Sequence, residues 1–381
     1  MLLKSLHATH AAPTSVKDPL WKYKWVQQNE PEIFAKVHKW LDVKEYLISR
    51  CTDRFIMTRG FRPYSTFLIR YAKRQGRMEQ SSLPYVWRRS GASSGTDRVH
   101  GYRRETYCKG RLRAGAFPGI CVYGGGGDAT LIGVGAGCTK TGKTHVYSGT
   151  SGWIGTVIDR QVVDISSMIA GIVGAQKGRY NYFAEMETAG KCFQWVKEHL
   201  ALDEIGVYLE KTDVAESTES LYESLYDYLS DTVKKIPAGA GGVIFTPWLH
   251  GNRCPFEDPN AAGMFFNIRI GTGKTEMIRA VLEGICFHLR WMLECEDKKV
   301  KTSQTIRFVG GGALSPVTCQ MLSDITGRTV ETVENTKDVG SIGAAILVAV
   351  GCGAIADFDH VEGYIPVKAR YEPDPKTRHI Y

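Results

Sequence analysis

A glycine-rich stretch at residues 123–155 carries the residue types and spacing that suit chemistry. It holds four consecutive glycines at 124–127, then Asp128, and later a second turn with the sequence GTSG at 149–152. Glycines let backbone amides approach a ligand closely, and successive exposed N–H groups form anion-binding concavities. A carboxylate beside such a loop can deprotonate an acceptor hydroxyl while backbone donors hold phosphates. The pattern therefore predicts phosphoryl transfer.

The same stretch contains GCTKTGKT at 137–144, which matches the P-loop pattern GxxxxGK[ST] letter for letter. A working P-loop opens a helix, because the helix N-terminus supplies amides to the phosphates. The residues that follow, HVYSGTSG, are rich in β-formers and glycine and predict a strand and a turn instead. We therefore interpret Lys143 as part of a hairpin turn and not as a phosphate ligand.

Composition limits the class of protein. The chain has 381 residues, 43% of them hydrophobic, which predicts about two or three domains with sizeable cores. No apolar run approaches about 18 residues, so no transmembrane span is expected, and the N-terminus makes a poor signal peptide. Ten cysteines without a CxxC pair favour reduced thiols and a cytoplasmic location.

Residues 59–118 differ from the rest of the chain. They hold 14 Lys/Arg against three acidic residues, although the whole chain has a net charge of only +8. They show no sustained period of a helix or a strand. Three explanations remain open. We favour an out-of-frame translation product, because globular sequence resumes abruptly at Val122. The segment could instead be a disordered basic loop, or it could bind nucleic acid, since arginines interleaved with aromatics can bind phosphates and stack on bases.

The elements that must position the chemistry lie on both sides of that segment. Residues 13–58 show helical apolar spacing, with a break at Asn29-Glu30-Pro31. The apolar positions are Trp25, Ile33, Phe34, Val37, Trp40 and Leu41. Further along, the patterns predict strands and turns at 157–173, helices at 187–201 and 217–235, and a buried strand at 242–248.

A long helix is predicted at 274–296, with His288 near its apolar face as a structural histidine. The positions that define this face are Ile278, Val281, Leu282, Ile285, Leu289, Met292 and Leu293.

A strand–loop–helix unit is predicted at 305–327. The strand TIRFV leads into three glycines at 310–312, and Ser315, Pro316 and Gly327 suit the helix start and stop. Glycine-rich backbone between a strand end and a helix start binds nucleotides in α/β sheets, but GxGxxG is not matched, so a dinucleotide fold is not supported. A strand at 329–333, a helix at 341–353 and a polar tail to Tyr381 complete the chain.

Six separated motifs together resemble those of the FGGY family of carbohydrate kinases. They are PLWKYKWVQQNE at 19–30, GGGGDA at 124–129, SGTSGWIG at 148–155, PWLHGNRCPFEDP at 247–259, the segment from Gly263 to Glu283, and FVGGGALSP with SDITG at 308–327. Asn267 departs from the family pattern, which usually has glycine there. The similarity covers about residues 13–58 and 122–353, and it is the shared order of the motifs that makes it specific.

This resemblance implies an α/β fold of the actin-like ATPase (ribonuclease H-like) type, with two domains around a cleft. It implies ATP and Mg²⁺ as cofactors and a ketose or polyol as the acceptor. Asp128 would be the base and would help to order the metal. The residues that would hold the phosphates or border the adenosine are Gly149, Thr150, Ser151, Gly251, Gly311, Gly312 and Ser315.

Two departures from the family are expected to affect activity. The family begins with a strand and an Asp-x-Gly-Thr phosphate loop, which this sequence lacks, and residues 59–118 do not resemble the family segment expected there. We therefore expect an incomplete N-terminal domain over 1–137, a nucleotide-binding C-terminal domain over 138–353 and a tail over 354–381. A catalytically dead nucleotide-binding protein is the alternative to an active kinase. The pattern is compatible with a homodimer, and no membrane partner is expected.

Overall fold

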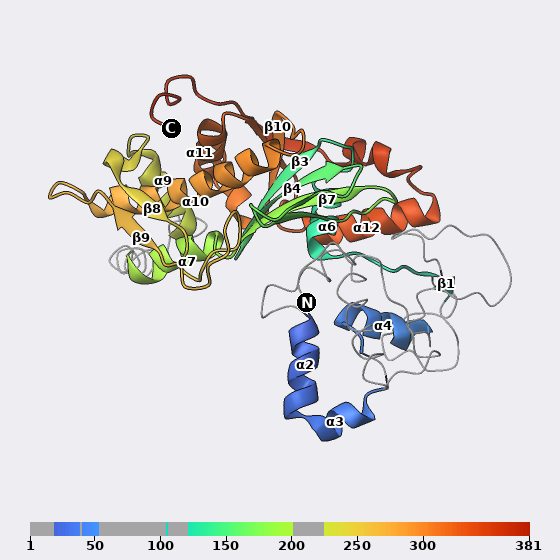
Figure 1. The fold of residues 1–381 in the computed structure, drawn as a ribbon. Helices are drawn as coiled ribbons and strands as arrows, with labels where there is room; N and C mark the ends of the chain where they lie inside the picture. The colour runs from blue at the N-terminus through green and yellow to red at the C-terminus, as the bar shows by residue number, and fades with distance from the viewer. Residues whose placement is uncertain (1–18, 39, 53–103, 106–120, 201–224) are drawn as a thin grey trace, which may run out of the picture. The chain divides into compact units, whose positions relative to one another are not determined.

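The computed structural model describes residues 19–38, 40–52, 104–105, 121–200 and 225–381 (Figure 1). Most of the anomalous segment 59–118 and the first part of the predicted helix 217–235 lie outside the described residues. The chain divides into two compact units. The first unit comprises Met1–Leu131, Ile172–Tyr180 and Ala344–Phe358, and the second comprises Ile132–Gly171, Asn181–Gly343 and Asp359–Tyr381. The predicted domain boundary at 137/138 stays a prediction.

In the first unit, the predicted helical region forms three helices. These are α2 (Pro19–Asn29), α3 (Pro31–Lys36) and α4 (Val43–Thr52). Pro31 occupies the first turn of α3 as predicted, because its fixed φ and missing N–H suit that position. Tyr23 is buried between the rings of Phe34 and Trp40, at centroid distances of 5.1 and 5.3 Å.

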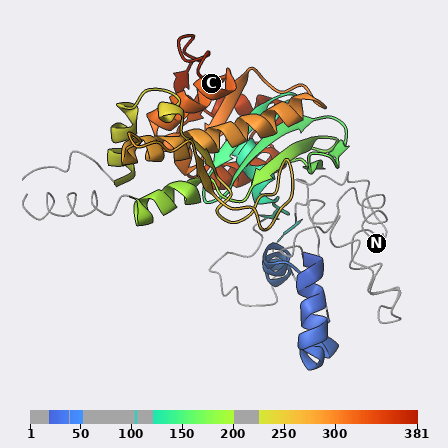
Figure 2. The same ribbon diagram turned by 60° about the vertical axis from the view of Figure 1, so that its left-hand side comes forward.

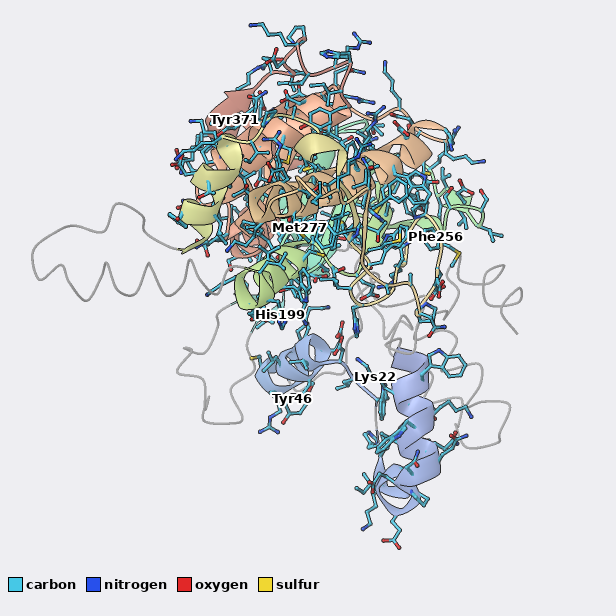
Figure 3. The ribbon with its side chains drawn as sticks, turned by 90° about the vertical axis from the view of Figure 1, so that its left-hand side faces the viewer. Lys22, Tyr46, His199, Phe256, Met277 and Tyr371 are labelled. Carbon is cyan, nitrogen blue, oxygen red and sulfur yellow. The ribbon has the colours of Figure 1, made fainter. Side chains whose placement is uncertain are left out.

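The predicted apolar positions of this region are not all buried. Trp25 and Ile33 are each 58% exposed, and Tyr46 of α4 is exposed as well (Figure 3). A short strand, β1 (Arg104–Glu105), pairs antiparallel with β2 (Cys121–Val122), which leads into the four glycines.

An eight-stranded sheet has the order β12-β11-β10-β3-β4-β7-β6-β5. Strand β10 runs parallel to β3 and β11, whereas β3–β4 and β11–β12 are antiparallel pairs. Every residue of β4 is buried, which explains why its sequence lacks the alternation of a half-exposed strand. The bounds are β3 Thr144–Ser148, β4 Gly152–Ile158, β5 Val163–Asp164, β6 Ile169–Val173, β7 Tyr180–Met186, β10 Thr305–Val309, β11 Thr329–Val333 and β12 Val367–Tyr371.

Helix α10 (Lys274–Asp297) lies across one face of this sheet (Figures 1 and 2). All seven apolar positions predicted for its buried face are buried, so that prediction is confirmed. Around it, the remaining helices are α7 (Gly190–His199), α9 (Leu225–Lys234) and α11 (Pro316–Thr326). Two further helices, α6 (Asp128–Gly135) and α12 (Val339–Cys352), and the short helices η2 (Ala240–Gly242), η3 (Gly311–Leu314) and η4 (Phe358–Tyr364) complete the described fold.

Three local predictions were wrong. The strand predicted at 242–248 is only β8 (Ile244–Thr246); it pairs with β9 (Met264–Phe266) in a separate two-stranded sheet, and Ile244 is 50% exposed. The segment 354–381, predicted as a polar tail, contributes η4 and the sheet strand β12. Lys143 lies in the turn between α6 and β3, whereas the hairpin turn itself is formed by residues 149–151.

No helix of the described ranges combines the length and apolar character that a membrane span needs.

Candidate functional site

Two glycine loops meet at the ends of neighbouring strands in the second unit. The first glycine loop (residues 149–151) joins β3 to β4, and the second (residues 310–315) follows β10, which is parallel to β3. A Cβ atom placed on Gly310 would lie 2.6 Å from the Ser148 carbonyl oxygen, and one on Gly312 would lie 2.8 Å from the Ser148 Oγ. Both distances are shorter than real Cβ contacts, so the second glycine loop packs against Ser148, which precedes the first glycine loop, more closely than a residue with a side chain would allow.

Backbone hydrogen bonds fix the first glycine loop. The Gly149 carbonyl accepts from the Gly190 N–H at 2.8 Å, and the Thr150 carbonyl accepts from Ala189 N–H at 3.1 Å and Lys191 N–H at 3.3 Å. These donors surround the N-terminus of α7, which has no side-chain cap and therefore needs such acceptors. Thr150 is exposed, while Ser151 is half-buried, so both residues of the loop are accessible to a ligand.

The second glycine loop is also well anchored. Gly310 has φ 92° and donates its N–H to the Thr336 carbonyl at 3.0 Å. Gly311 is exposed, and a Cβ on it would meet no atom closer than 3.9 Å, so its backbone is open to a ligand. Ser315 caps α11 as predicted, accepting from the Thr318 N–H at 3.2 Å.

The Ser315 hydroxyl also donates to the Ser230 Oγ of α9 at 3.2 Å, which ties α9 to this loop.

Gly251 lies in a different loop, which is stabilised by hydrogen bonds among its own residues. It has φ 76°, and a Cβ there would lie 3.0 Å from the Asp258 carbonyl oxygen. Asn252 and Asp258 exchange backbone hydrogen bonds at 2.8 and 3.0 Å. The loop geometry therefore accounts for the glycine without a ligand, and nucleotide contact by Gly251 stays a prediction.

Asp128 belongs to the first unit, where it is the first residue of α6. Its side chain is exposed, and its Oδ1 accepts from the Ala129 N–H at 2.8 Å. A cavity of about 700 Å³ is lined by Asp128 together with part of α4 and the glycine segment. The lining residues are Asp42, Val43, Lys44, Leu47, Ile48, Cys51, Val122, Gly126, Gly127 and Asp128. This volume is in the range of small-molecule sites.

Lys44 connects α4 to the glycine segment. Its Nζ donates to the Gly124 carbonyl at 3.3 Å and pairs with the buried Glu45 carboxylate at 2.6 Å. A Cβ on Gly125 would lie 3.2 Å from the Lys44 Cδ. Sequence reasoning missed this helix as part of the cavity, because its apolar residues Val43 and Leu47 are exposed while Glu45 is buried, and such a pattern gives no signal of what the helix faces.

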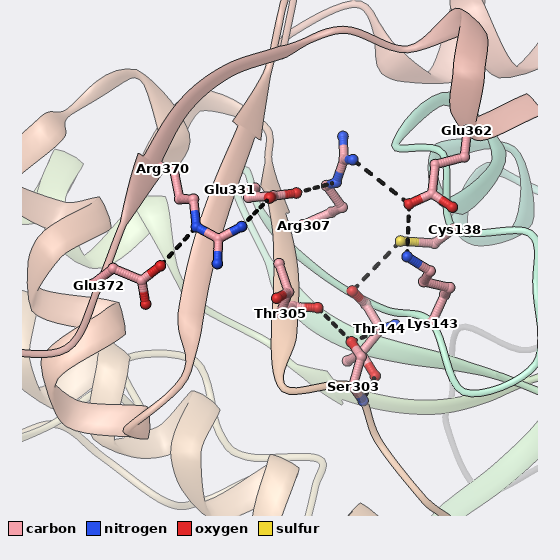
Figure 4. A network of polar contacts seen from close by, with 10 residues as sticks. All are labelled: Cys138, Lys143, Thr144, Ser303, Thr305, Arg307, Glu331, Glu362, Arg370 and Glu372. Carbon is pink, nitrogen blue, oxygen red and sulfur yellow. Dashed lines mark hydrogen bonds and ion pairs between the residues drawn. The ribbon is translucent and has the colours of Figure 1, made fainter.

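The lysine of the P-loop-like motif is engaged in an ion network. Lys143 Nζ pairs with Glu362 at 2.6 Å, and Glu362 also lies 3.9 Å from Arg307 of β10. Arg307 pairs with Glu331 of β11 at 2.9 Å, and the network continues through Arg370 to Glu372 (Figure 4). The segment after Lys143 is β3, not a helix, which confirms that the motif is not a working P-loop.

His288 is a structural histidine, as predicted. Its Nδ1 accepts from the Trp248 indole N–H at 3.2 Å, and its Nε2 lies 2.7 Å from the Cys254 carbonyl. Burial lowers its pKa to about 4, so the ring is neutral and both nitrogens have partners. His145 of β3, whose ring lies against Gly133 and Gly155, is likewise buried, with its pKa lowered to about 4 by burial.

The described fold is a mixed α/β architecture. It superposes on the ligand-bound xylulose kinase from Lactobacillus acidophilus with a TM-score of 0.80 at 23% identity, covering 100% of this chain and 72% of that one. It also superposes on the Plasmodium falciparum glycerol kinase with ADP, with a TM-score of 0.76 at 19% identity, covering 100% and 72% of the two chains. The fold is therefore the actin-like ATPase fold of the sugar kinases, as predicted.

Residues 145–352 match the model for the C-terminal domain of the FGGY family of carbohydrate kinases. The chain is 28% identical to the gluconokinase of Bacillus licheniformis over 374 residues, which is 95% of this chain and 68% of that protein. It is 26% identical to the xylulose kinase of Bacillus subtilis over 367 residues, which is 94% and 68% of the two chains. Since the family model covers more than half of the sequence, the protein belongs to the FGGY family of carbohydrate kinases.

Proposed function

We propose that this chain transfers the γ-phosphoryl group of ATP to a hydroxyl of a ketose or polyol, with Asp128 as the general base. The observation that carries the proposal is the exposed Asp128 carboxylate on a cavity of about 700 Å³. A base must reach the proton that it abstracts, and a side chain on the wall of a cavity of ligand size meets that requirement. Lys44 would act by fixing the glycine segment that presents Asp128.

The two glycine loops are the proposed nucleotide site. Gly149, Thr150 and Ser151 would hold phosphates, because a hydroxyl-bearing loop at a strand end offers short polar contacts to anions. Gly311 and Gly312 would border the adenosine, and the open backbone at Gly311 fits that role. Ser315 would act indirectly, since its hydroxyl already caps α11 and donates to Ser230.

Mg²⁺ would be held by Asp128 and the phosphates of the nucleotide. Mg²⁺ commonly binds through one or two carboxylates plus phosphate oxygens, and a single exposed carboxylate with one oxygen engaged by Ala129 N–H fits this pattern. When bound, the metal would neutralise charge on the transferred phosphoryl group. The described residues contain no cluster of three or more His, Cys, Asp or Glu that could hold a metal.

The acceptor is proposed from the relatives. Similar proteins are named xylulose kinase and gluconokinase, so a ketose and a sugar acid are the two substrates to compare. We propose a xylulose-like acceptor.

The test is an ADP-release assay with ATP and Mg²⁺ over a panel of xylulose, gluconate, glycerol and their close analogues. We expect ADP release that depends on one acceptor and falls at least about 100-fold in Asp128→Asn, the range of general-base catalysis. A matched control is Asp42→Asn, which changes another carboxylate on the same cavity wall. Equal rates for wild type and Asp128→Asn would reject Asp128 as the base.

ADP binding without turnover on any acceptor would instead support the alternative of a nucleotide-binding protein that has lost catalysis. A nucleic-acid role for residues 59–118 would require binding with a steep salt dependence that is lost when the segment is deleted.

A further inference from the structure

Tyr147 of β3 lies where the two glycine loops meet. It pairs across the hairpin with Trp153 of β4 and, on its other side, with Val309 of β10. Its ring stacks on the Trp153 ring, with centroids 4.0 Å apart and planes 22° apart. Trp153 is itself buried and touches Phe183 of β7 at a centroid distance of 5.7 Å. The tyrosine ring is therefore held against a rigid aromatic neighbour in the middle of the sheet.

The two ends of this ring fill the space beside both loops. A Cβ on Gly149 would lie 2.6 Å from the Tyr147 Cζ, and a Cβ on Gly310 would lie 3.0 Å from the Tyr147 Cδ2. A side chain at residue 149 must displace this ring, whereas one at residue 310 meets the Ser148 carbonyl first and the ring next. Gly149 was predicted as a phosphate-binding glycine, but its surroundings already give a packing reason for it.

The other side of the first glycine loop leaves no room for it to shift. Its carbonyls are bonded to the α7 N-terminus through Gly190 and Ala189, and Ser148 abuts the second glycine loop. A side chain added at residue 149 would therefore force the Tyr147 ring to move.

We propose that Tyr147 is a positioning residue for the nucleotide: its ring, braced by Trp153, sets the distance between the phosphate-binding and adenosine-binding loops. This inference rests on the proposed function of the two glycine loops. Truncating the ring would weaken binding of the nucleotide, which must contact both loops at once, and would leave acceptor binding unchanged. The role is one of spacing, so a phenylalanine ring would serve.

The experiment is a cycle of Tyr147→Ala, Gly149→Ala and the double variant, with ADP binding measured by calorimetry in the presence of Mg²⁺. We expect each single variant to weaken ADP binding at least about tenfold, because a tenfold change corresponds to a shift of only about 1.4 kcal/mol. In the Tyr147→Ala background the added methyl at residue 149 has space, so the second substitution changes the dissociation constant less than about twofold. Tyr147→Phe should bind ADP like wild type.

Two controls separate positioning from general destabilisation. Tyr371→Ala removes another half-buried tyrosine ring from β12 of the same sheet, and it should leave the ADP dissociation constant unchanged. The Michaelis constant for the acceptor should also be unchanged in Tyr147→Ala. Wild-type ADP affinity in Tyr147→Ala, or independent effects of the two substitutions in the cycle, would overturn the inference.

Absence of ADP binding by the wild type would overturn the proposed function and the nucleotide role of Tyr147 with it. In that case the urea midpoints of Tyr147→Ala, Gly149→Ala and the double variant still test whether the ring separates the loops. Additive shifts of the midpoint would refute this spacing role, and non-additive shifts would support it.

Discussion

Glu296 of α10 gives the sharpest test of the described structure, because it is a carboxylic acid with no exposure to solvent. Its Oε2 accepts from the Thr156 hydroxyl at 2.6 Å, and Thr156 is in turn 2.9 Å from the Thr144 hydroxyl. Burial raises the pKa of Glu296 from 4.5 to about 8. At neutral pH the native state therefore holds a proton that the unfolded state has released.

The magnitude follows from proton linkage. Between the unfolded-state and native-state pKa values of Glu296, the native state holds one extra proton. As the pH rises through this range, the free energy of unfolding falls by up to about 1.4 kcal/mol for each pH unit. Below pH 6.5 the buried His145 and His288 oppose this trend, because burial lowers their pKa from 6.5 to about 4. Between pH 6.5 and 8 the two histidines stay neutral in the native state, while in the unfolded state they lose their remaining protons. This offsets part of the Glu296 effect, so the net loss should be roughly 1 kcal/mol.

We expect Glu296→Gln to remove this loss of unfolding free energy with rising pH. Urea unfolding followed by tryptophan fluorescence at four pH values from 6.5 to 8 measures it. The control is Glu294→Gln on the same helix, whose carboxylate is 53% exposed and paired with Arg290, and which should keep the wild-type slope. Identical slopes for wild type and Glu296→Gln would refute the reasoning that this acid is buried and protonated.

Three further changes have expected outcomes. Arg279→Met leaves the buried Glu283 without its ion-pair partner at 2.6 Å, so the free energy of unfolding should fall by about 3–5 kcal/mol in urea titrations, and an unchanged midpoint would contradict the pairing. Ser315→Ala removes the N-cap of α11 and should lower the free energy of unfolding by about 1 kcal/mol. Ser315→Asp should restore most of the lost stability. As pH falls from 6.5 towards 4, stability should be lost because His145 and His288 are buried neutral; acid titration of a His288→Gln variant should show a shallower loss.

Several elements were predictable from the sequence because local physics decides them. The apolar face of α10 repeats at helical spacing from Ile278 to Leu293, within a helix of 24 residues, and such a long period leaves no competing interpretation. The boundaries of α11 were set by Ser315 and by Gly327, which ends the helix with φ 66°. Pro31 likewise marked the start of α3. Each of these features depends on residues within a few positions along the chain.

Other features depend on distant residues and gave no sequence signal. Arg279 and Glu283 have the spacing of an exposed helix ion pair, yet they are buried because the chain around Ile236 and the Tyr381 hydroxyl cover them. Strand β12 looked like a polar tail, since an outer strand with exposed side chains has no apolar alternation. Gly149 is a different case: the residue that excludes a side chain there is Tyr147, only two positions earlier on β3, and no motif records that contact.

The ion pair between Lys143 and Glu362 has a practical consequence for chemical labelling. Acyl-phosphate derivatives of ATP modify lysines whose amines sit next to a bound phosphate, and a letter-based search would nominate Lys143 as their target. The ammonium of Lys143 lies 2.6 Å from the Glu362 carboxylate on η4, so this lysine is paired with an anion of the protein itself and not with a nucleotide phosphate. A proteomic survey with such probes should recover peptides from this kinase without the GCTKTGKT lysine among the modified sites.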